Sequence, residues 1–251
     1  MVQRVTNYIR KIACSFRKRS ILSRLNYKEK ELISRIRSQN LTYLSDTKLA
    51  SIASTCNLIE EDNLPGIFLE AGCALGGSAI LIASLKNPLR QLFIYDIFGM
   101  IPSPTEQDSQ DVHHRYRTIM EGNAKGIGND KYYGYLDNLY DIVQSNLKNF
   151  GINCDENSVS LIKGLIQETM TINQPVAFAH VDVDWYEPVM TCLSRVFPSL
   201  VIGGSIILDD YHDWGGCRKA TDEFLRKIPG QFVLDGSAGS IKITKIKTNN
   251  V

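Results

Sequence analysis

Two short acidic segments carry the residues best suited to chemistry. Asp182 and Asp184 lie in one segment, Asp209 and Asp210 form the other, and each follows an apolar run typical of a buried strand. Ligand sites of open α/β sheets lie beyond the carboxyl ends of the strands. If the two strands are neighbours, about 4.8 Å apart, Asp182, Asp209 and Asp210 can converge on one point. Asp182 and Asp184 are two residues apart, so in an extended chain they point to the same side.

Carboxylates crowded in this way repel one another, and without a cation one or more of them would be driven to bind a proton. A hard metal such as Mg²⁺ relieves the repulsion, with oxygen ligands at about 2.1 Å. No histidine and cysteine set with zinc spacing accompanies the acids. The pattern predicts an oxygen-ligated metal, against the alternative that the acids cap helices or face solvent. Such a metal activates a bound hydroxyl, and a free carboxylate beside it can accept the proton.

A glycine-rich turn is the second candidate site. Residues 70–78 read Glu-Ala-Gly-Cys-Ala-Leu-Gly-Gly-Ser, after a short apolar strand and at the start of a helix. Gly72 permits a sharp turn, and the helix N-terminus offers free N–H groups to a carboxylate or phosphate. Asp96, at the end of the next strand, stands where an acid accepts the ribose hydroxyls of an adenine nucleotide. This spacing fits NAD and S-adenosylmethionine equally, and a purely structural turn remains an alternative.

The elements that position these residues alternate between strands and helices. We expect strands at 67–70, 92–96, 159–163, 176–184, 205–208, 232–234 and 240–246, the last two forming a hairpin. We expect two helices within 26–62, and others at 78–86, 135–150, 187–197 and 217–227. Residues 99–138, rich in Gly, Pro, Asn and Asp, are expected to form an active-site lid. The order predicts an α/β fold with a doubly wound, mostly parallel sheet and an antiparallel C-terminal edge strand.

Composition bounds the class of protein. The 251 residues are 43% hydrophobic and 22% charged, which suits one α/β domain with an N-terminal extension. No run of eighteen apolar residues occurs, so we expect no transmembrane helix. The six cysteines are scattered without a CxxC pair, which favours reduced thiols in a cytoplasmic protein.

The N-terminal segment differs from the rest of the chain. Residues 1–28 hold eight Arg and Lys residues and no acid, although the whole chain has a net charge of only +1. Apolar residues recur there at helical spacing, which predicts a basic amphipathic helix. Such a helix either lies on an anionic membrane or packs on its own domain or on a second subunit, and a cleaved transit peptide has the same composition.

Together these segments resemble the macrocin-type O-methyltransferases, which methylate sugar hydroxyls of macrolide and aminocoumarin antibiotics. The matching stretches are residues 69–78, 95–102, 163–169, 181–188, 208–211 and 216–220, in family order over roughly residues 40–246. The resemblance implies a class I methyltransferase (Rossmann-like) fold with a seven-stranded sheet and S-adenosylmethionine as the methyl donor.

The resemblance also implies roles for single residues. Asp182, Asp209 and Asp210 match metal ligands, and Asp184 matches the general base. The predicted cofactor-binding residues are Glu70, Gly72, Cys73, Ser78, Asp96 and Asp182. Residues 43–45 stand where relatives contact the amino-acid end of the cofactor, often through a Thr-Met pair that this sequence lacks.

We therefore expect an O-methyltransferase that uses S-adenosylmethionine and Mg²⁺, or another divalent metal, to methylate a hydroxyl of a sugar or glycosylated small molecule. A catechol-like phenol is the alternative acceptor. A dinucleotide-dependent oxidoreductase would need a tighter phosphate loop and no acidic site, and a non-catalytic sugar-binding module would need no base. The expected organisation is a basic helical extension with cap helices over 1–62 and a methyltransferase domain over 63–251. We expect a cytoplasmic homo-oligomer without a nucleic-acid partner, with peripheral membrane contact through residues 1–28 left open.

Overall fold

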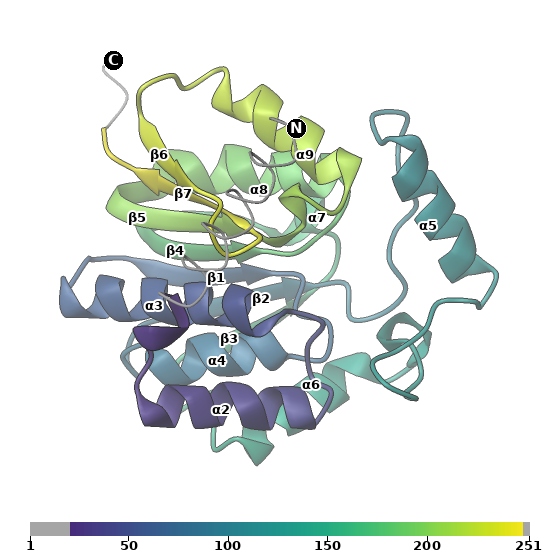
Figure 1. Ribbon diagram of the computed structural model, residues 1–251, viewed down its shortest axis with the longest axis horizontal. Coiled ribbons are helices and arrows are strands. Elements are labelled where there is room, and N and C mark those ends of the chain that lie inside the picture. Colours follow the sequence, from purple (N-terminus) through teal and green to yellow (C-terminus); the bar gives the residue numbers. More distant parts are fainter. Residues whose placement is uncertain (1–20, 248–251) are drawn as a thin grey trace, which may run out of the picture.

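The computed structural model describes residues 21–247, and in this part of the chain one sheet has the strand order β3-β2-β1-β4-β5-β7-β6 (Figure 1). Strands β1 to β5 are parallel, and β7 is antiparallel to both β5 and β6. The strands are β1 (Ile67–Ala71), β2 (Leu92–Asp96), β3 (Val159–Lys163), β4 (Val176–Val181), β5 (Leu200–Leu208), β6 (Phe232–Asp235) and β7 (Ile241–Lys245). This confirms the predicted α/β fold with a mostly parallel seven-stranded sheet and a C-terminal hairpin at its edge. The structure adds that β7 is the inner strand of this hairpin, next to β5, and that β6 is the edge strand of the sheet.

Helices cover both faces of the sheet (Figure 1). One face carries α2 (Tyr27–Ser38), α3 (Asp46–Glu61), α4 (Gly77–Leu85) and α6 (Leu139–Asn149). The other carries α7 (Ile166–Thr169), α8 (Tyr186–Ser199) and α9 (Gly215–Leu225). Each face therefore has its own apolar core, as expected for a doubly wound sheet.

The two cores form because successive side chains of the central strands point to opposite faces of the sheet. On β1, Phe68 packs into the first core, whereas Ile67 and Leu69 pack into the second. The Phe68 ring meets that of Phe178 on β4 edge to face, with centroids 5.4 Å apart. Burying such a side chain contributes on the order of 2–3 kcal/mol. The central strands are thus apolar on both sides, and polar residues remain for their carboxyl ends.

The segment before β1 is held by two capped helices. Asn26 and Glu29 form a reciprocal capping box at the start of α2, and Ser45 caps α3 through the amide of Lys48. Both helices contribute to the first core, with Ile36 and Leu49 fully buried. The predicted basic helix falls on residues 1–28, of which 1–20 lie outside the described residues. No helix within residues 21–247 is long and apolar enough to cross a membrane.

The lid region contains more regular structure than the sequence predicts. It includes α5 (Gln110–Met120), which stands away from the sheet beyond α9, and the short helix η1 (Tyr133–Tyr135) (Figure 1). The Asp108 carboxylate accepts a hydrogen bond from the Tyr186 amide at 2.7 Å, and Asp111 accepts one from the Gly215 amide at 3.0 Å. These bonds attach the lid to the N-termini of α8 and α9.

Two predicted strand boundaries are wrong by more than one residue. Strand β4 ends at Val181 instead of Asp184, and Asp184 adopts a left-handed conformation with φ of 57°, outside the region of regular strands. Strand β5 begins at Leu200 instead of Ser205, so Gly203 and Gly204 lie within it. A Cβ atom on Gly204 would lie 2.9 Å from the Ala177 carbonyl, so only glycine lets the irregular strand continue there.

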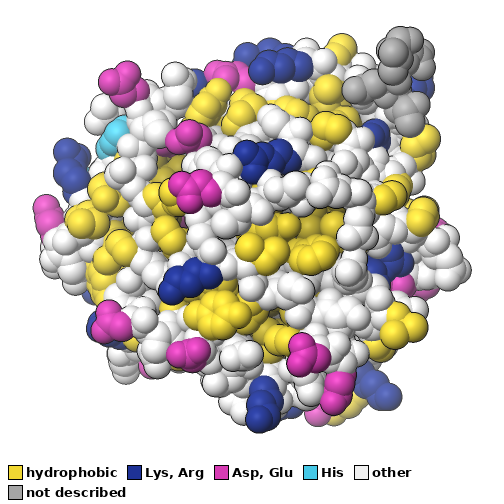
Figure 2. Space-filling model, turned by 180° about the vertical axis from the view of Figure 1, so that it is seen from behind, with side chains coloured by type: hydrophobic (Ala, Val, Ile, Leu, Met, Phe, Trp, Pro, Cys, Tyr) yellow, Lys and Arg dark blue, Asp and Glu magenta, His cyan; other side chains and the backbone are white. Residues whose placement is uncertain are grey.

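Charges of both signs are scattered over the described surface of the rear face, with hydrophobic side chains gathered between them (Figure 2). Neither sign forms a continuous field on the described part of that face.

Candidate active site

The acidic residues meet where the parallel strands end. The Asp182 amide, directly after β4, donates to the carbonyl of Ala71 at the end of β1 at 2.8 Å. Asp209 and Asp210 begin the short helix η2 (Asp209–Tyr211), which follows β5. Because β4 and β5 are parallel neighbours, all these carboxylates lie at one edge of the sheet, as the sequence predicts.

The carboxylates form two groups that share Asp210. Asp182, Asp184 and Asp210 offer oxygens that all lie within 4.8 Å of one another, and so do Asp209, Asp210 and Asp213. The predicted set of Asp182, Asp209 and Asp210 is thus divided between the groups. Asp184 joins its group through the left-handed turn at its own backbone, not through the extended chain that the spacing suggested.

Crowding changes the acidity of these groups. Burial, with the charge of Asp209 adding to it, raises the pKa of Asp182 to about 8. Burial raises the pKa of Asp184 to about 6, against the opposing effects of an Asp210 hydrogen bond and the Arg115 charge. Burial and the neighbouring carboxylates hold the pKa of Asp210 well above its usual range. Without a cation, the cluster therefore retains protons near neutral pH.

Two buried carboxylate oxygens show what the cluster lacks. Oδ1 of Asp209 and Oδ2 of Asp210 are buried and have no hydrogen-bond partner among the described residues. Buried polar atoms are rarely left without a partner. The two groups contain only carboxylates, a donor set that suits a hard divalent cation. The residues present therefore fit a magnesium site.

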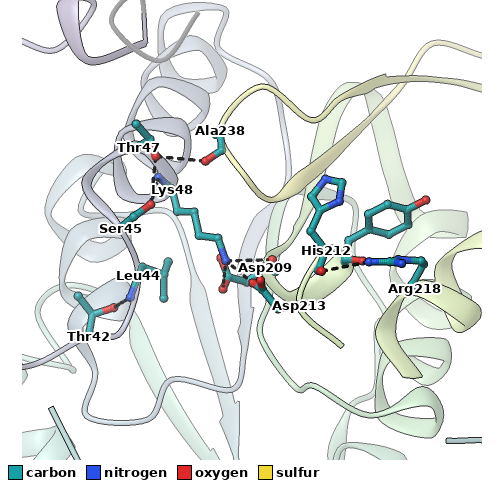
Figure 3. A network of polar contacts seen from close by, with 11 residues as sticks. Thr42, Leu44, Ser45, Thr47, Lys48, Asp209, His212, Asp213, Arg218 and Ala238 are labelled. Atoms are coloured by element: carbon teal, nitrogen blue, oxygen red, sulfur yellow. Dashed lines mark hydrogen bonds and ion pairs between the residues drawn. The ribbon is translucent and has the colours of Figure 1, made fainter. Parts of the chain in front are cut away.

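Sequence reasoning missed a lysine that forms ion pairs with the second acidic group, Asp209, Asp210 and Asp213. Lys48, on α3, places its Nζ 2.9 Å from Oδ2 of Asp209 and 2.9 Å from Oδ2 of Asp213 (Figure 3). Burial alone would lower the pKa of Lys48, but the two carboxylates outweigh it and raise the pKa. A lone lysine in an amphipathic helix gives no sequence signal of such a role.

The glycine turn is held closely against the acidic loop. Gly72 has a φ of 81°, and a Cβ atom there would lie 2.0 Å from the Asp182 carbonyl. The Asp96 carboxylate accepts hydrogen bonds from the amides of Cys73 at 2.8 Å and Phe98 at 2.7 Å. Asp96 thus organises the turn, and its unused lone pairs can still accept a ligand hydroxyl.

Two adjoining cavities open at this edge and share six lining residues, which are Gly72, Asp96, Tyr133, Asp182, Asp184 and Trp185. The first, here the apolar cavity, is also lined by Ile97, Ile101, Pro102, Leu165 and Ile166. The second, here the acidic cavity, has a volume of about 310 Å³ and is also lined by Tyr43, Leu44, Lys48, Arg115, Tyr132, Asp209, Asp210 and Trp214. The shared residues make one continuous binding region from the two cavities.

Three predicted cofactor residues lie outside both cavities. Cys73 and Ser78 are buried, and the Glu70 carboxylate faces His180 inside the sheet, 3.1 Å from Nδ1. Gly72, Asp96 and Asp182 line both cavities. Sequence reasoning missed Lys48, Arg115 and Tyr133 as lining residues, because they lie on α3 and in the lid, far along the chain from the motifs.

Comparison with known proteins decides between the cofactors that this geometry allows. A family model described as macrocin-O-methyltransferase (TylF) matches residues 15–230. The chain belongs to the macrocin-O-methyltransferase family. It is therefore an S-adenosylmethionine-dependent O-methyltransferase, which excludes the oxidoreductase and the non-catalytic binding module.

Three curated relatives of this methyltransferase are named for related activities. The demethyldecarbamoylnovobiocin O-methyltransferase of Streptomyces niveus is 24% identical over 74% of this chain and 68% of that protein. A rhamnosyl-tetracenomycin-C 4'-O-methyltransferase of Streptomyces olivaceus is 26% identical over 75% and 64%. The mycinamicin III 3''-O-methyltransferase of Micromonospora griseorubida is 27% identical over 65% and 61%. The chain thus matches about two thirds of the length of each relative.

Solved structures share the fold. The O-methyltransferase NovP has a TM-score of 0.68 at 21% identity, with 82% of this chain and 83% of that chain covered. The calicheamicin methyltransferase CalS11 has a TM-score of 0.59 at 18% identity, with 94% and 92% covered. A Podospora anserina methyltransferase, PaMTH1, solved with S-adenosylhomocysteine bound, has a TM-score of 0.54 at 17% identity, with 89% of each chain covered. At these identities the likeness establishes the class I methyltransferase architecture.

Proposed function

We propose that this methyltransferase transfers the methyl group of S-adenosylmethionine to a hydroxyl of a sugar or glycosylated small molecule, and that Mg²⁺ takes part in the reaction. The observation that carries the proposal is the gathering of the Asp182, Asp184 and Asp210 carboxylates within 4.8 Å, beside the glycine turn. A methyl donor on the turn and a hydroxyl at the acids would then be neighbours.

Asp182, Asp209 and Asp210 are the proposed metal ligands. The unpartnered Oδ1 of Asp209 and Oδ2 of Asp210 support this assignment, since a buried oxygen without a donor is ready to accept a cation. When bound, Mg²⁺ would lower the pKa of the acceptor hydroxyl and fix its orientation.

The cofactor would extend across Gly72 from one cavity to the other. Ile97, Leu165 and Ile166 give the apolar cavity surfaces that suit an adenine ring. Asp96, between the cavities, would accept the ribose hydroxyls. The amino-acid end would reach toward the N-terminus of α4 and the segment at Tyr43, which borders the acidic cavity.

Asp184 is the proposed general base. Its carboxylate belongs to the acidic group, and a pKa of about 6 leaves it ionised at neutral pH and able to receive a proton. Asp184 would take the proton of the acceptor hydroxyl while the oxygen attacks the sulfonium methyl, so that the O–C bond forms as the S–C bond breaks and S-adenosylhomocysteine leaves with the bonding electron pair. Positioning of the two reactants by the cavity walls would supply much of the rate.

The acidic cavity favours a ring-shaped acceptor. Trp185 and Trp214 pack edge to face, with centroids 6.2 Å apart, and both line this cavity together with Tyr132. Aromatic faces suit sugar rings. The names of two relatives, which specify a rhamnosyl 4'-position and a mycinamicin 3''-position, support a glycoside as the acceptor class.

Other predictions stay as proposals. They are the division into 1–62 and 63–251, a cytoplasmic location, the absence of a nucleic-acid partner, and membrane contact through residues 1–28. For the predicted homo-oligomer, the exposed Val233 and Leu234 on edge strand β6 offer a surface that can pair with another chain. Analytical ultracentrifugation of the full chain would test whether it forms a homo-oligomer.

The reaction can be tested with labelled S-adenosylmethionine and a panel of glycosides and catechols. We expect label transfer to glycosides that is abolished by a chelator and restored by Mg²⁺. Asp184→Asn should lower kcat by about 100-fold or more, while binding of S-adenosylhomocysteine changes little. Transfer that survives chelation would refute the metal, and a preference for catechols would refute the sugar.

A further inference from the structure

The ammonium group of Lys48 lies among the acidic residues. Its Nζ donates to Oδ2 of Asp209 at 2.9 Å, to the Asp209 carbonyl at 3.2 Å and to Oδ2 of Asp213 at 2.9 Å (Figure 3). The lysine side chain is 15% exposed and that of Asp209 is 8% exposed. An ammonium group has three N–H donors, and three acceptors take them here. Lys48 is therefore fixed in the cluster and is not a solvated surface charge.

The two carboxylate oxygens of Asp209 have different surroundings. Lys48 holds Oδ2, whereas Oδ1 is buried and has no partner among the described residues. A carboxylate fixed at one oxygen presents the other in a defined direction. The single cation of α3, which is partly buried, thus lies one carboxylate away from the proposed metal position.

Residues beside Lys48 hold the start of α3 against the acidic cavity and the C-terminal hairpin. Next to Lys48, the Thr47 hydroxyl donates to the Ala238 carbonyl in the turn between β6 and β7 at 3.2 Å (Figure 3). Tyr43 and Leu44, just before α3, line the acidic cavity together with Lys48. The start of α3, which carries Lys48, is therefore fixed against the C-terminal hairpin.

We propose that Lys48 is a positioning residue that acts as an internal counter-cation: it stabilises the carboxylate cluster without metal and weakens the binding of the divalent metal by repulsion. This inference rests on the metal-dependent reaction proposed above. Two cations on one carboxylate repel each other strongly in a partly buried site. The cluster therefore remains folded without Mg²⁺, and the metal binds with moderate affinity.

Calorimetric titration of the full chain with Mg²⁺, and separately with Mn²⁺, tests the inference. Lys48→Met removes the charge, Lys48→Arg keeps it, and Lys242→Met removes a charge from the ion pair with Asp235 on the C-terminal hairpin, which contains no proposed metal ligand. We expect Lys48→Met to bind each metal about tenfold more tightly than wild type or tighter. The Arg and Lys242 variants should stay within about threefold of wild type.

Thermal unfolding supplies a second readout. Without metal, Lys48→Met should unfold at a lower temperature than wild type, because Asp209 loses its counter-charge. Saturating Mg²⁺ should raise its Tm by more than it raises that of wild type. If Lys48→Met does not fold, Lys48→Gln removes the charge and keeps a donor for the same comparison.

Three results would overturn the inference. They are equal or weaker metal binding by Lys48→Met, equal tightening by Lys48→Arg, and no metal binding by either wild type or Lys48→Met. Failure of the proposed function looks different, because it appears as methyl transfer that persists in chelator. The binding and activity measurements therefore separate the two.

Discussion

Nδ1 of His180 on β4 lies 3.1 Å from Oε1 of Glu70 on β1, and both side chains are fully buried. The two residues are register partners in the centre of the parallel sheet. Burial would lower the pKa of His180, but the hydrogen bond and charge of Glu70 outweigh it and raise the pKa. Two residues beyond this pair lie Gly72 and Asp182, so the pair fixes the relative position of the glycine turn and the acidic loop.

Glu70→Gln should lower the free energy of unfolding by about 2–4 kcal/mol, because it leaves the buried His180 without a charged partner. Urea denaturation measures the loss. His180→Gln should cost a similar amount, and the double variant should cost less than the sum of the two. Additive losses would show that the two side chains do not act as a pair.

Gly72→Ala should cost more than about 3 kcal/mol and abolish methyl transfer, because the added Cβ would lie 2.0 Å from the Asp182 carbonyl. Gly122→Ala is the matched control: its φ is 76° against 81° at Gly72, but its Cβ would meet nothing within 4 Å. The control should cost only about 1–2 kcal/mol and keep activity. Equal losses in both variants would place the cause in backbone conformation alone.

The stability of the metal-free protein should fall as the pH rises from about 4 to about 8. Burial raises the pKa of Asp182 to about 8, so the folded state binds more protons than the unfolded state across this window. The slope of stability against pH is then negative. Thermal unfolding at each pH measures it.

Two controls accompany the pH profile. Asp182→Asn should make it less steep, because one of the carboxyl groups whose pKa burial raises is gone. Saturating Mg²⁺ should flatten it as well, since bound carboxylates stay ionised. A metal-free profile that rises over this range would contradict the pKa direction.

Asp108→Ala should loosen the lid. The carboxylate accepts from the Tyr186 amide at 2.7 Å and from the Thr105 amide at 2.9 Å, so it caps α8 where Trp185 at the N-cap cannot. Loss of such a cap costs about 0.5–2 kcal/mol. Amide hydrogen exchange should accelerate at the start of α8 and over 105–120. Asp108→Asn, which keeps an acceptor oxygen, should show a smaller effect, and unchanged exchange in both would contradict the anchor.

The sequence predicts the fold and the acidic edge for a common reason. Apolar runs identify the strands, and parallel strands place their carboxyl ends together, so Asp182 and Asp210 meet whatever the loops do. The sequence does not predict the turn at Asp184, because Asp adopts the left-handed conformation more often than most residues but still only rarely, so residue type alone does not signal it. The Asp184 carboxylate nevertheless lies in one group with those of Asp182 and Asp210.

Features that depend on distant parts of the chain could not be predicted. Lys48 and Asp209 are 161 residues apart, and nothing in the amphipathic pattern of α3 separates Lys48 from a solvated lysine. Helix α5 buries only Val112 and Ile119, too weak a pattern to stand out in a segment rich in Gly, Pro and Asn. Tertiary contacts, not local propensity, decide both.

The position of β7 has a consequence for biosynthesis. Strand β5, which leads to Asp209 and Asp210, obtains its second neighbour only from residues 241–245, the last strand that the structure describes. A ribosome delivers the glycine turn and β4 well before this strand, and domains fold as units once their parts are available. The catalytic edge is therefore assembled last. A message truncated shortly before codon 241 would yield a chain that contains every proposed site residue and yet lacks the strand that supports two of them.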